Sequence, residues 1–354
     1  MKVPLLVLAA AIARLSGATL ELVAGGGAGT PPTKAANVQL REPFGVEFTP
    51  AGEMIVVEMS QGERVLRLDR AGVVHHVAGT GQKGFAGDGG DPKQAQFNGI
   101  HNLTILPDGA VLLADSWNQR IRRLDPKLTK IETWAGNGKK AYEGDGGPAV
   151  NAAFGMVIQI AADSKSEFIY VADIASKRVR RINVRSGIVE TVAGNGKGGV
   201  PVDGAKAVDS PLTDPRAVVP DPQGGFYILE RGGHALRYVT PGGLIKTVAG
   251  TGRAGLDGDG GPAISAALNG PKHLCLDRDG TVIIADAENH VIRRYDPKTG
   301  MINRIAGTGK KGSAGVGGDP LKAELNRPHG VTIGPEGALY ITDSYNNRIL
   351  KVVP

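Results

Sequence analysis

Short apolar segments separated by turn sequences recur along the whole chain. In residues 97–153 the apolar segments read NLTIL, AVLLA, RIRRL and KIETWAG, and the turns PDG, DSWNQ and DPKLTK lie between them. Apolar positions within each segment repeat about every two residues, which is the period of a β-strand, whereas an α-helix requires a period of about 3.6 residues. The pattern therefore predicts four short antiparallel strands, which we name a to d in chain order.

This unit of four strands is repeated six times. Equivalent apolar residues open the units, at spacings of 57, 57, 58, 56 and 57 residues: Leu40, Phe97, Phe154, Leu212, Leu268 and Leu325. Six units of four antiparallel strands are typical of a β-propeller. The sequence thus predicts an all-β fold, a single six-bladed propeller over residues 19–354.

The last unit lacks its fourth strand. It ends HGVTIGPEGALYITDSYNNRILKVVP, which supplies strands a to c only. The segment LELVAGGG, which starts at residue 20, resembles the strand d sequences IETWAG and IKTVAG of other units. We expect residues 19–25 to pair as the outer strand of the sixth blade, because this closes the ring and removes an exposed edge.

Residues 1–18 have the pattern of a secretory signal, with a lysine at position 2, an apolar run over 3–13 and small residues at 16–18. The alternative is an apolar N-terminus that packs on the protein. We expect a secreted or periplasmic monomer, and no run is long enough to span a bilayer. The formal net charge of +6 suits an acidic partner, and the single Cys275 excludes an internal disulfide.

The segments YITDSYNNRILKV, LLADSWNQRIRRL and RPHGVTI resemble the NHL repeat, and the likeness covers residues 19–354. It extends to the gluconolactonase and senescence-marker-protein group and, more distantly, to peptidyl-hydroxyglycine lyase. The resemblance implies that strand a lines a central channel, that strand d is outermost, and that the b–c turns and d–a connections share one face. This architecture carries lyases, lactonases, extracellular sensors and RNA-binding modules, so it leaves the function open.

The d–a connections are long. The connection over residues 79–99 reads GTGQKGFAGDGGDPKQAQFNG, and its end predicts a short helix with Asp91 as N-cap and Pro92 at the first helical position. Connections of this length in a compact domain are usually functional. We expect six of them to form a ligand-binding rim around the channel mouth.

One residue in each unit, four positions after the opening apolar residue, should begin strand a at this mouth. These residues are Phe44, His101, Ile158, Arg216, Lys272 and His329. His273 lies next to Lys272. His101, Arg216 and His329 come from alternate blades, so they could converge on the axis.

Strand b ends on a carboxylate in every unit. Four units carry Asp, and two carry Glu: Asp115, Asp173, Asp286, Asp343, Glu58 and Glu230. The aspartates are expected to cap the b–c turn. The glutamates have two interpretations, the same cap on a longer arm or a metal ligand or catalytic base at the mouth.

The resemblances raise the question of a metal. Peptidyl-hydroxyglycine lyase holds zinc with three histidines at the channel, and His101 and His329 match two of these while Arg216 stands where a third would be. A cation beside two imidazoles opposes metal binding. The gluconolactonase group holds a divalent ion with Glu, Asn and Asp, to which Glu58 and Glu230 could contribute. One divalent ion (Ca or Zn) and a metal-free polar mouth both remain open.

The arginine pairs of strand c, at residues 122–123, 180–181 and 293–294, repeat with the blades. We expect them to make structural hydrogen bonds, because arginine satisfies carbonyls and carboxylates. With 5% aromatic residues for base stacking and an expected export signal, a nucleic acid partner is the least favoured.

Two functional hypotheses follow. In the first, an exported propeller binds a small-molecule ligand or an extracellular or periplasmic protein at the mouth and the d–a connections. In the second, the protein is a metal-assisted hydrolase or lyase. Its catalytic residues would be His101, His329, Glu58 and Glu230, with the two histidines as metal ligands. Substrate-binding residues would be Arg216, Lys272, His273 and Phe44.

Overall fold

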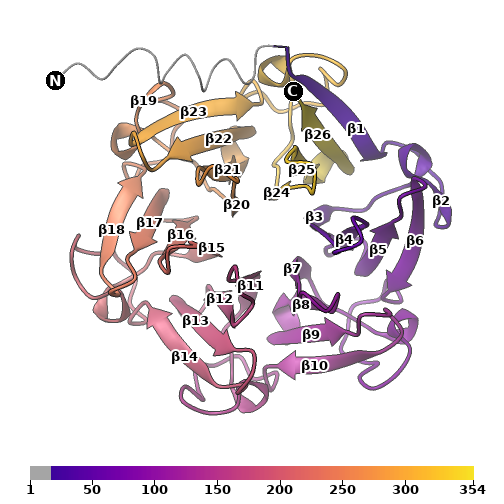
Figure 1. The fold of residues 1–354 in the computed structure, drawn as a ribbon, viewed down its shortest axis with the longest axis horizontal. Coiled ribbons are helices and arrows are strands. Elements are labelled where there is room, and N and C mark those ends of the chain that lie inside the picture. Colours follow the sequence, from indigo (N-terminus) through magenta and orange to yellow (C-terminus); the bar gives the residue numbers. More distant parts are fainter. Residues whose placement is uncertain (1–16) are drawn as a thin grey trace.

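The computed structural model describes residues 17–354. The expected signal segment, residues 1–18, lies almost entirely outside the described residues. The described chain forms six antiparallel sheets arranged radially about one axis, a six-bladed β-propeller (Figure 1). The all-β fold predicted from the repeat is therefore confirmed.

The first three blades follow the predicted strand order. Their strands are β3 (Pro43–Phe48), β4 (Met54–Glu58), β5 (Arg64–Leu68) and β6 (Val73–Ala78); β7 (Ile100–Ile105), β8 (Val111–Asp115), β9 (Arg120–Leu124) and β10 (Ile131–Ala135); and β11 (Val157–Ala162), β12 (Phe168–Asp173), β13 (Arg178–Asn183) and β14 (Val189–Ala193). The two-residue strand β2 (Thr33–Lys34) adds a short fifth strand outside β6.

The remaining blades repeat this order. Their strands are β15 (Pro215–Pro220), β16 (Phe226–Glu230), β17 (Ala235–Val239) and β18 (Ile245–Ala249); β20 (His273–Leu276), β21 (Val282–Asp286), β22 (Val291–Asp296) and β23 (Met301–Ala306); and β24 (Gly330–Ile333), β25 (Leu339–Asp343) and β26 (Arg348–Val353). Strand β19 (Gly261–Pro262) pairs outside β23.

The ring is closed by the N-terminal strand β1 (Thr19–Gly25). It pairs antiparallel with β26, from Thr19 opposite Val353 to Gly25 opposite Arg348. The sixth blade thus has the order β1-β26-β25-β24, which confirms the closure predicted from the missing fourth strand. Because β1 covers the outer edge of β26, that strand presents no unpaired edge to another chain.

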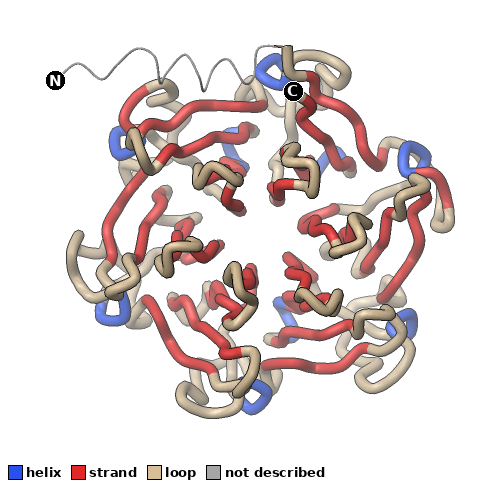
Figure 2. The backbone as a smooth tube through the Cα atoms, in the orientation of Figure 1, coloured by secondary structure: helices blue, strands red, loops and turns tan. Residues whose placement is uncertain are grey.

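Short 3₁₀ turns are the only helical elements within residues 17–354. Those of the d–a connections contact strand d on the outside of the ring: η1 (Ala35–Asn37), η2 (Pro92–Gln94), η4 (Ala149–Asn151), η5 (Ala207–Asp209), η6 (Ala263–Ser265) and η8 (Pro320–Lys322) (Figure 2). At η2 the Asp91 carboxylate accepts from the Lys93 amide, with Pro92 at the first position, as expected. Three more lie in b–c turns: η3 (Ser116–Asn118), η7 (Ala287–Asn289) and η9 (Ser344–Asn346). None of these helical turns is long enough to cross a membrane.

The hydrophobic core lies between neighbouring blades. Each cluster of buried side chains draws on two adjacent sheets; one of them joins Leu112 of β8 to Ile169 and Val171 of β12. The six apolar residues that open the repeats are all buried in these interfaces. Because each blade buries one face against each neighbour, the regular spacing of apolar residues in the sequence builds the whole ring.

Three buried arginines of strand c tie the d–a connections to the blades. Arg122, Arg180 and Arg293 are fully buried and donate to carbonyls of the connection, such as Arg180 to Ala153 at 2.7 Å. Each also pairs with the aspartate of a GDGG motif: Asp88, Asp145 and Asp259. The arginine repeats are therefore structural, as expected from their recurrence.

Candidate functional site

The six predicted mouth residues lie where strand a begins, at the inner side of each blade. In blades 1 to 4 the pairing of strands a and b skips Phe44, His101, Ile158 and Arg216, so these residues sit on β-bulges. In blades 5 and 6, Lys272 and His329 directly precede the inner strands β20 and β24. A bulge re-aims a side chain away from the regular sheet. The local backbone therefore sets the four side chains of blades 1 to 4 apart from the packed faces of the blades.

Aromatic rings connect three of these blades. The Phe44 ring stacks on His329 with 4.0 Å between centroids and meets the edge of His101 at 5.5 Å. Trp117 lies edge-on to His101 at 5.8 Å, and Tyr345 lies edge-on to His329 at 5.6 Å. His101 and His329 thus flank one phenylalanine, within a continuous row of five rings.

The histidines are held neutral with a defined tautomer. His101 Nδ1 lies 2.9 Å from the Gly99 carbonyl and His329 Nδ1 lies 2.8 Å from the Arg327 carbonyl. A carbonyl only accepts, so each Nδ1 carries the hydrogen and each Nε2 keeps a lone pair. Burial, followed by the charge of Arg216, lowers the pKa of His101 to about 3. Burial and the charges of Lys272 and Arg216 also lower the pKa of His329.

Arg216 is a buried cation without a partner. Its side chain is 6% exposed, and within residues 17–354 its guanidinium makes no hydrogen bond or ion pair; its Nε is fully buried. Asp214, the carboxylate whose charge acts on Arg216, is bound at 2.5 Å by Arg231. Burial, followed by the charge of Arg231, lowers the pKa of Arg216 to about 9.

Lys272, in contrast, belongs to an ion-pair cluster. Its ammonium lies 2.8 Å from Glu288, and the same carboxylate binds Arg327. Burial lowers the pKa of Lys272 to about 8, although Glu288 opposes this shift. On this side of the mouth, Arg216, Arg231, Lys272 and Arg327 face the two carboxylates Asp214 and Glu288. Four cations against two anions leave an excess of positive charge.

His273 points across the ring instead of into the mouth cluster. Its Nε2 lies 3.1 Å from Asn102 Nδ2, which belongs to the second blade, whereas His273 belongs to the fifth. Figure 1 shows the two inner strands, β7 and β20, on opposite sides of the axis. Burial, followed by the charge of Arg216, lowers the pKa of His273 to about 4.

Glu58 and Glu230 are not brought together with the histidines. Each accepts the backbone amide at the end of a d–a connection, Glu58 from Arg41 and Glu230 from Thr213. Asp115, Asp173, Asp286 and Asp343 accept the corresponding amides in the other blades. Both glutamates are fully buried and paired with arginine, Glu58 with Arg64 and Glu230 with Arg237. Their contacts are those of the turn cap on a longer arm.

The donor set at the mouth does not fit a metal ion. Within residues 17–354 no group of three or more His, Cys, Asp or Glu side chains is arranged to hold one. His101 and His329 supply two nitrogens, but Arg216 and Lys272 bring positive charge to both rings. A cation in that place opposes a second cation.

Four residues of the mouth are missing from the prediction made from the sequence: Trp117, Glu288, Tyr345 and Arg327. The first three occupy one equivalent position in the b–c turns, two residues after the aspartate that ends strand b. Arg327 stands where two other blades have Gly99 and Gly270. A comparison of the b–c turns between the units would have found these departures, because the turn lies on the same face as the d–a connection.

Comparisons with known proteins agree with this architecture. The NHL repeat model matches residues 325–352, which cover the three inner strands of the sixth blade. The chain is a six-bladed β-propeller whose last blade matches the NHL repeat. It is 25% identical over 295 residues to Protein SUPPRESSOR OF QUENCHING 1, chloroplastic, of Arabidopsis thaliana, covering 78% of this chain and 27% of that protein. NHL repeat-containing protein 2 of Gallus gallus is 23% identical over 341 residues, 88% of this chain and 46% of that protein.

The chain therefore spans less than half the length of these relatives. Among solved structures, an auxiliary nutrient binding protein from Bacteroides ovatus superimposes with a TM-score of 0.68 at 14% identity, over 95% of this chain and 76% of that one. The putative gluconolactonase of a structural genomics target gives 0.57 at 12% identity, over 95% and 92%. At these identities the likeness shows the propeller fold alone.

Proposed function

We propose that this NHL-repeat propeller binds a small anionic ligand at the channel mouth, with Arg216 as the anchoring cation. The observation that carries the proposal is the buried, unpaired guanidinium of Arg216. A buried charge without a partner is costly, and proteins retain such costs at functional sites. A carboxylate or phosphate of the ligand would supply the two hydrogen bonds that arginine is shaped to give.

The neutral histidines define what else the ligand carries. His101 and His329 each keep an Nε2 lone pair, and the tautomer is fixed by the bond from Nδ1 to a backbone carbonyl. The matching ligand group is a hydrogen-bond donor such as a hydroxyl. Phe44 offers an apolar ring between the two imidazoles. An anion that also bears a hydroxyl group, such as a hydroxycarboxylate, fits this set.

Binding is better supported than hydrolase or lyase chemistry. A general base works best when its pKa lies near the working pH. Burial lowers the pKa of His101 to about 3, which makes its imidazole a weak base. Glu58 and Glu230, the other candidate bases, are engaged by arginines and backbone amides.

We further propose that the protein acts outside the cytoplasm. The support is the pattern of residues 1–18 and the fit of strand β1, which begins at Thr19, directly after the expected cleavage site. Small-molecule binding is favoured over a protein partner, because the unpaired charge is buried and a flat protein surface would not reach it.

The test is isothermal titration of citrate, phosphate and sulfate at constant ionic strength, with Arg216→Gln beside the native chain. A hydrogen bond to a charged group contributes about 1.5–3 kcal/mol, so the variant should bind roughly 10- to 150-fold more weakly. The control is Arg185→Gln, which removes one positive charge from an exposed c–d turn. Tricarballylate is citrate without its hydroxyl. The native chain should bind it more weakly than citrate, whereas His101→Ala should bind the two anions equally.

Two outcomes would contradict the proposal: none of the three anions binds, or Arg216→Gln binds as tightly as the native chain. A second measurement guards against misfolding. Because the free protein carries an uncompensated buried cation, Arg216→Met should be more stable than the native chain. Its free energy of unfolding, measured in urea, should be higher by about 1–4 kcal/mol. A variant that is more stable and yet fails to bind cannot owe its loss of binding to unfolding.

A further inference from the structure

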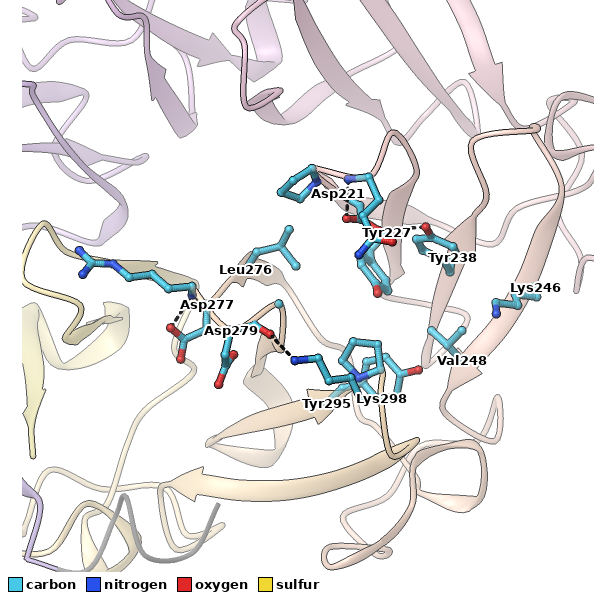
Figure 3. A pocket seen from close by; sticks show the side chains of 15 residues that line it. Asp221, Tyr227, Tyr238, Lys246, Val248, Leu276, Asp277, Asp279, Tyr295 and Lys298 are labelled. Atoms are coloured by element: carbon cyan, nitrogen blue, oxygen red, sulfur yellow. Dashed lines mark hydrogen bonds between the residues drawn. The ribbon is translucent and has the colours of Figure 1, made fainter. Parts of the chain in front are cut away.

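A cavity lies on the face of the ring opposite to the channel mouth, between blades 4 and 5. Its volume is about 450 Å³, and its walls come from the a–b turns, the c–d turn of blade 5 and the outer strand β18. Three tyrosines, Tyr227, Tyr238 and Tyr295, form its inner wall (Figure 3). A cavity of this size is within the range of small-molecule sites.

Two of the tyrosines break the repeat. Tyr238 pairs with Tyr227 across strands b and c. The residue in its place in the other five blades is a cation: Arg67, Arg123, Arg181, Arg294 and Lys351. Tyr295 is also unique, since the other blades carry an aliphatic residue there: Leu68, Leu124, Ile182, Val239 and Val352. Both departures line the same cavity, which the repeat alone would not produce.

The tyrosine rings present apolar faces, and two of the three hydroxyls are free. Tyr227 and Tyr295 are each 5% exposed, with 6.5 Å between ring centroids, and Tyr238 lies 4.8 Å from Tyr227. Tyr238 donates to Asp221 at 2.9 Å. Within residues 17–354 the hydroxyls of Tyr227 and Tyr295 have no hydrogen-bond partner. Both residues line the cavity, where a ligand can supply the partner that a tyrosine hydroxyl usually finds.

The charges around the cavity are balanced. Three carboxylates and three cations line it: Asp221, Asp277, Asp279, Lys246, Arg278 and Lys298. Arg294, which lies behind the wall, holds Asp277 at 2.6 Å, and Arg278 reaches the Gly334 carbonyl. The Lys246 ammonium lies 5.5 Å from the centre of the Tyr238 ring. No unpaired charge like that of Arg216 selects an anion here.

We propose that this tyrosine cavity binds a neutral polyhydroxylated ligand of the size of a mono- or disaccharide. The apolar faces of the rings suit the C–H face of such a ligand. Its hydroxyls both donate and accept hydrogen bonds. They therefore match the tyrosine hydroxyls, the amide of Gln223 and the charged groups at the rim. The inference is independent of the anion site, which lies on the other face.

The protein is titrated with glucose, galactose, mannose, maltose and cellobiose. Saturation-transfer NMR detects binding, and calorimetry measures the affinity. The variants Tyr295→Leu and Tyr238→Arg restore the residue types of the other blades, so they should fold. Each is expected to weaken binding of the best sugar at least tenfold. The matched control is Tyr340→Ile, which removes a tyrosine at the position of Tyr227 in blade 6, outside the cavity, where its hydroxyl bonds to Glu336 at 2.6 Å.

The proposal is overturned if no sugar of the panel binds, or if Tyr295→Leu and Tyr238→Arg bind as the native chain does. Stronger binding of glucuronate or glucose 6-phosphate than of glucose would overturn its neutral character. Circular dichroism of each variant verifies the fold, and Gln223→Ala on the exposed turn gives a variant whose folding is not in question. Arg216→Gln should leave sugar binding unchanged, which separates this result from the fate of the anion site.

Discussion

At the scale of single residues, His101 shows how burial sets charge. Its folded-state pKa of about 3 lies below the value of 6.5 for an unburied imidazole. Between these pH values the unfolded chain binds the extra proton and the folded chain does not, so acidification favours unfolding. The stability that His101 contributes is complete above pH 6.5 and is lost as the pH falls toward 3.

We therefore expect His101→Gln to lose less stability on acidification than the native chain. Between pH 6.5 and 5 the difference should reach about 1–2 kcal/mol, since one pH unit is worth about 1.4 kcal/mol per proton. Urea unfolding at both pH values measures it. Comparison with the native chain is essential, because burial raises the pKa of Glu47 and of Asp286 to about 7, and these acids act in the opposite direction. An NMR titration of the His101 ring with a midpoint near 6.5 would contradict the prediction.

At the scale of elements, β1 holds the ring closed from the outside. Leu20 is fully buried among side chains of blades 5 and 6, whereas Leu22 on the same strand is 39% exposed. Leu20→Ala should reduce the free energy of unfolding by about 2–5 kcal/mol through the cavity it leaves. Leu22→Ala, a matched change on the same strand, should change it by only about 0.5 kcal/mol. Equal effects in urea unfolding would mean that β1 is not packed as described.

The elements could be predicted because their causes are local. The period of two within a segment and the spacing near 57 residues determined strands, blades and the closing strand, and the same spacing placed six equivalent residues at the start of strand a. The ion pair between Glu288 and Arg327 could not be predicted, because these residues meet only once the fifth and sixth blades stand side by side. The equivalence of Glu58 with the capping aspartates also needed the structure, since it depends on the reach of the longer side chain to the Arg41 amide.

At the scale of the whole molecule, the two faces of the propeller differ in what the repeat leaves unpaired. The mouth carries an uncompensated cation, Arg216, and the opposite face carries balanced charges and two free tyrosine hydroxyls, at Tyr227 and Tyr295. Both sites lie where single blades depart from the shared pattern. A repeat fold can change such positions without cost to its neighbours, because each blade packs only on the next two.

The centre of the ring is joined by one polar chain through four blades. The Ile160 amide donates to Asn102 Oδ1 at 3.0 Å, so Asn102 Nδ2 is directed at His273 Nε2. The Val331 amide reaches His273 Nδ1 at 3.3 Å. A neutral imidazole accepts at one nitrogen only, so His273 accepts either from Asn102 or from Val331, and the shorter contact assigns the lone pair to Nε2. The bond between Asn102 and His273 is then the direct link between opposite blades.

A double-mutant cycle with Asn102→Ala and His273→Ala measures this link. Asn102→Ala also removes the bond from the Ile160 amide of the neighbouring blade, and the cycle cancels that loss. We expect a coupling energy of about 0.5–1.5 kcal/mol in urea unfolding, the usual net contribution of one hydrogen bond. The control cycle combines Asn102→Ala with His76→Ala on the outer strand β6, where the ring bonds to the Gly79 carbonyl at 2.7 Å. The effects of that control pair on the free energy of unfolding should be additive. If the effects of the Asn102 and His273 changes are additive too, opposite blades are held together by their neighbours alone.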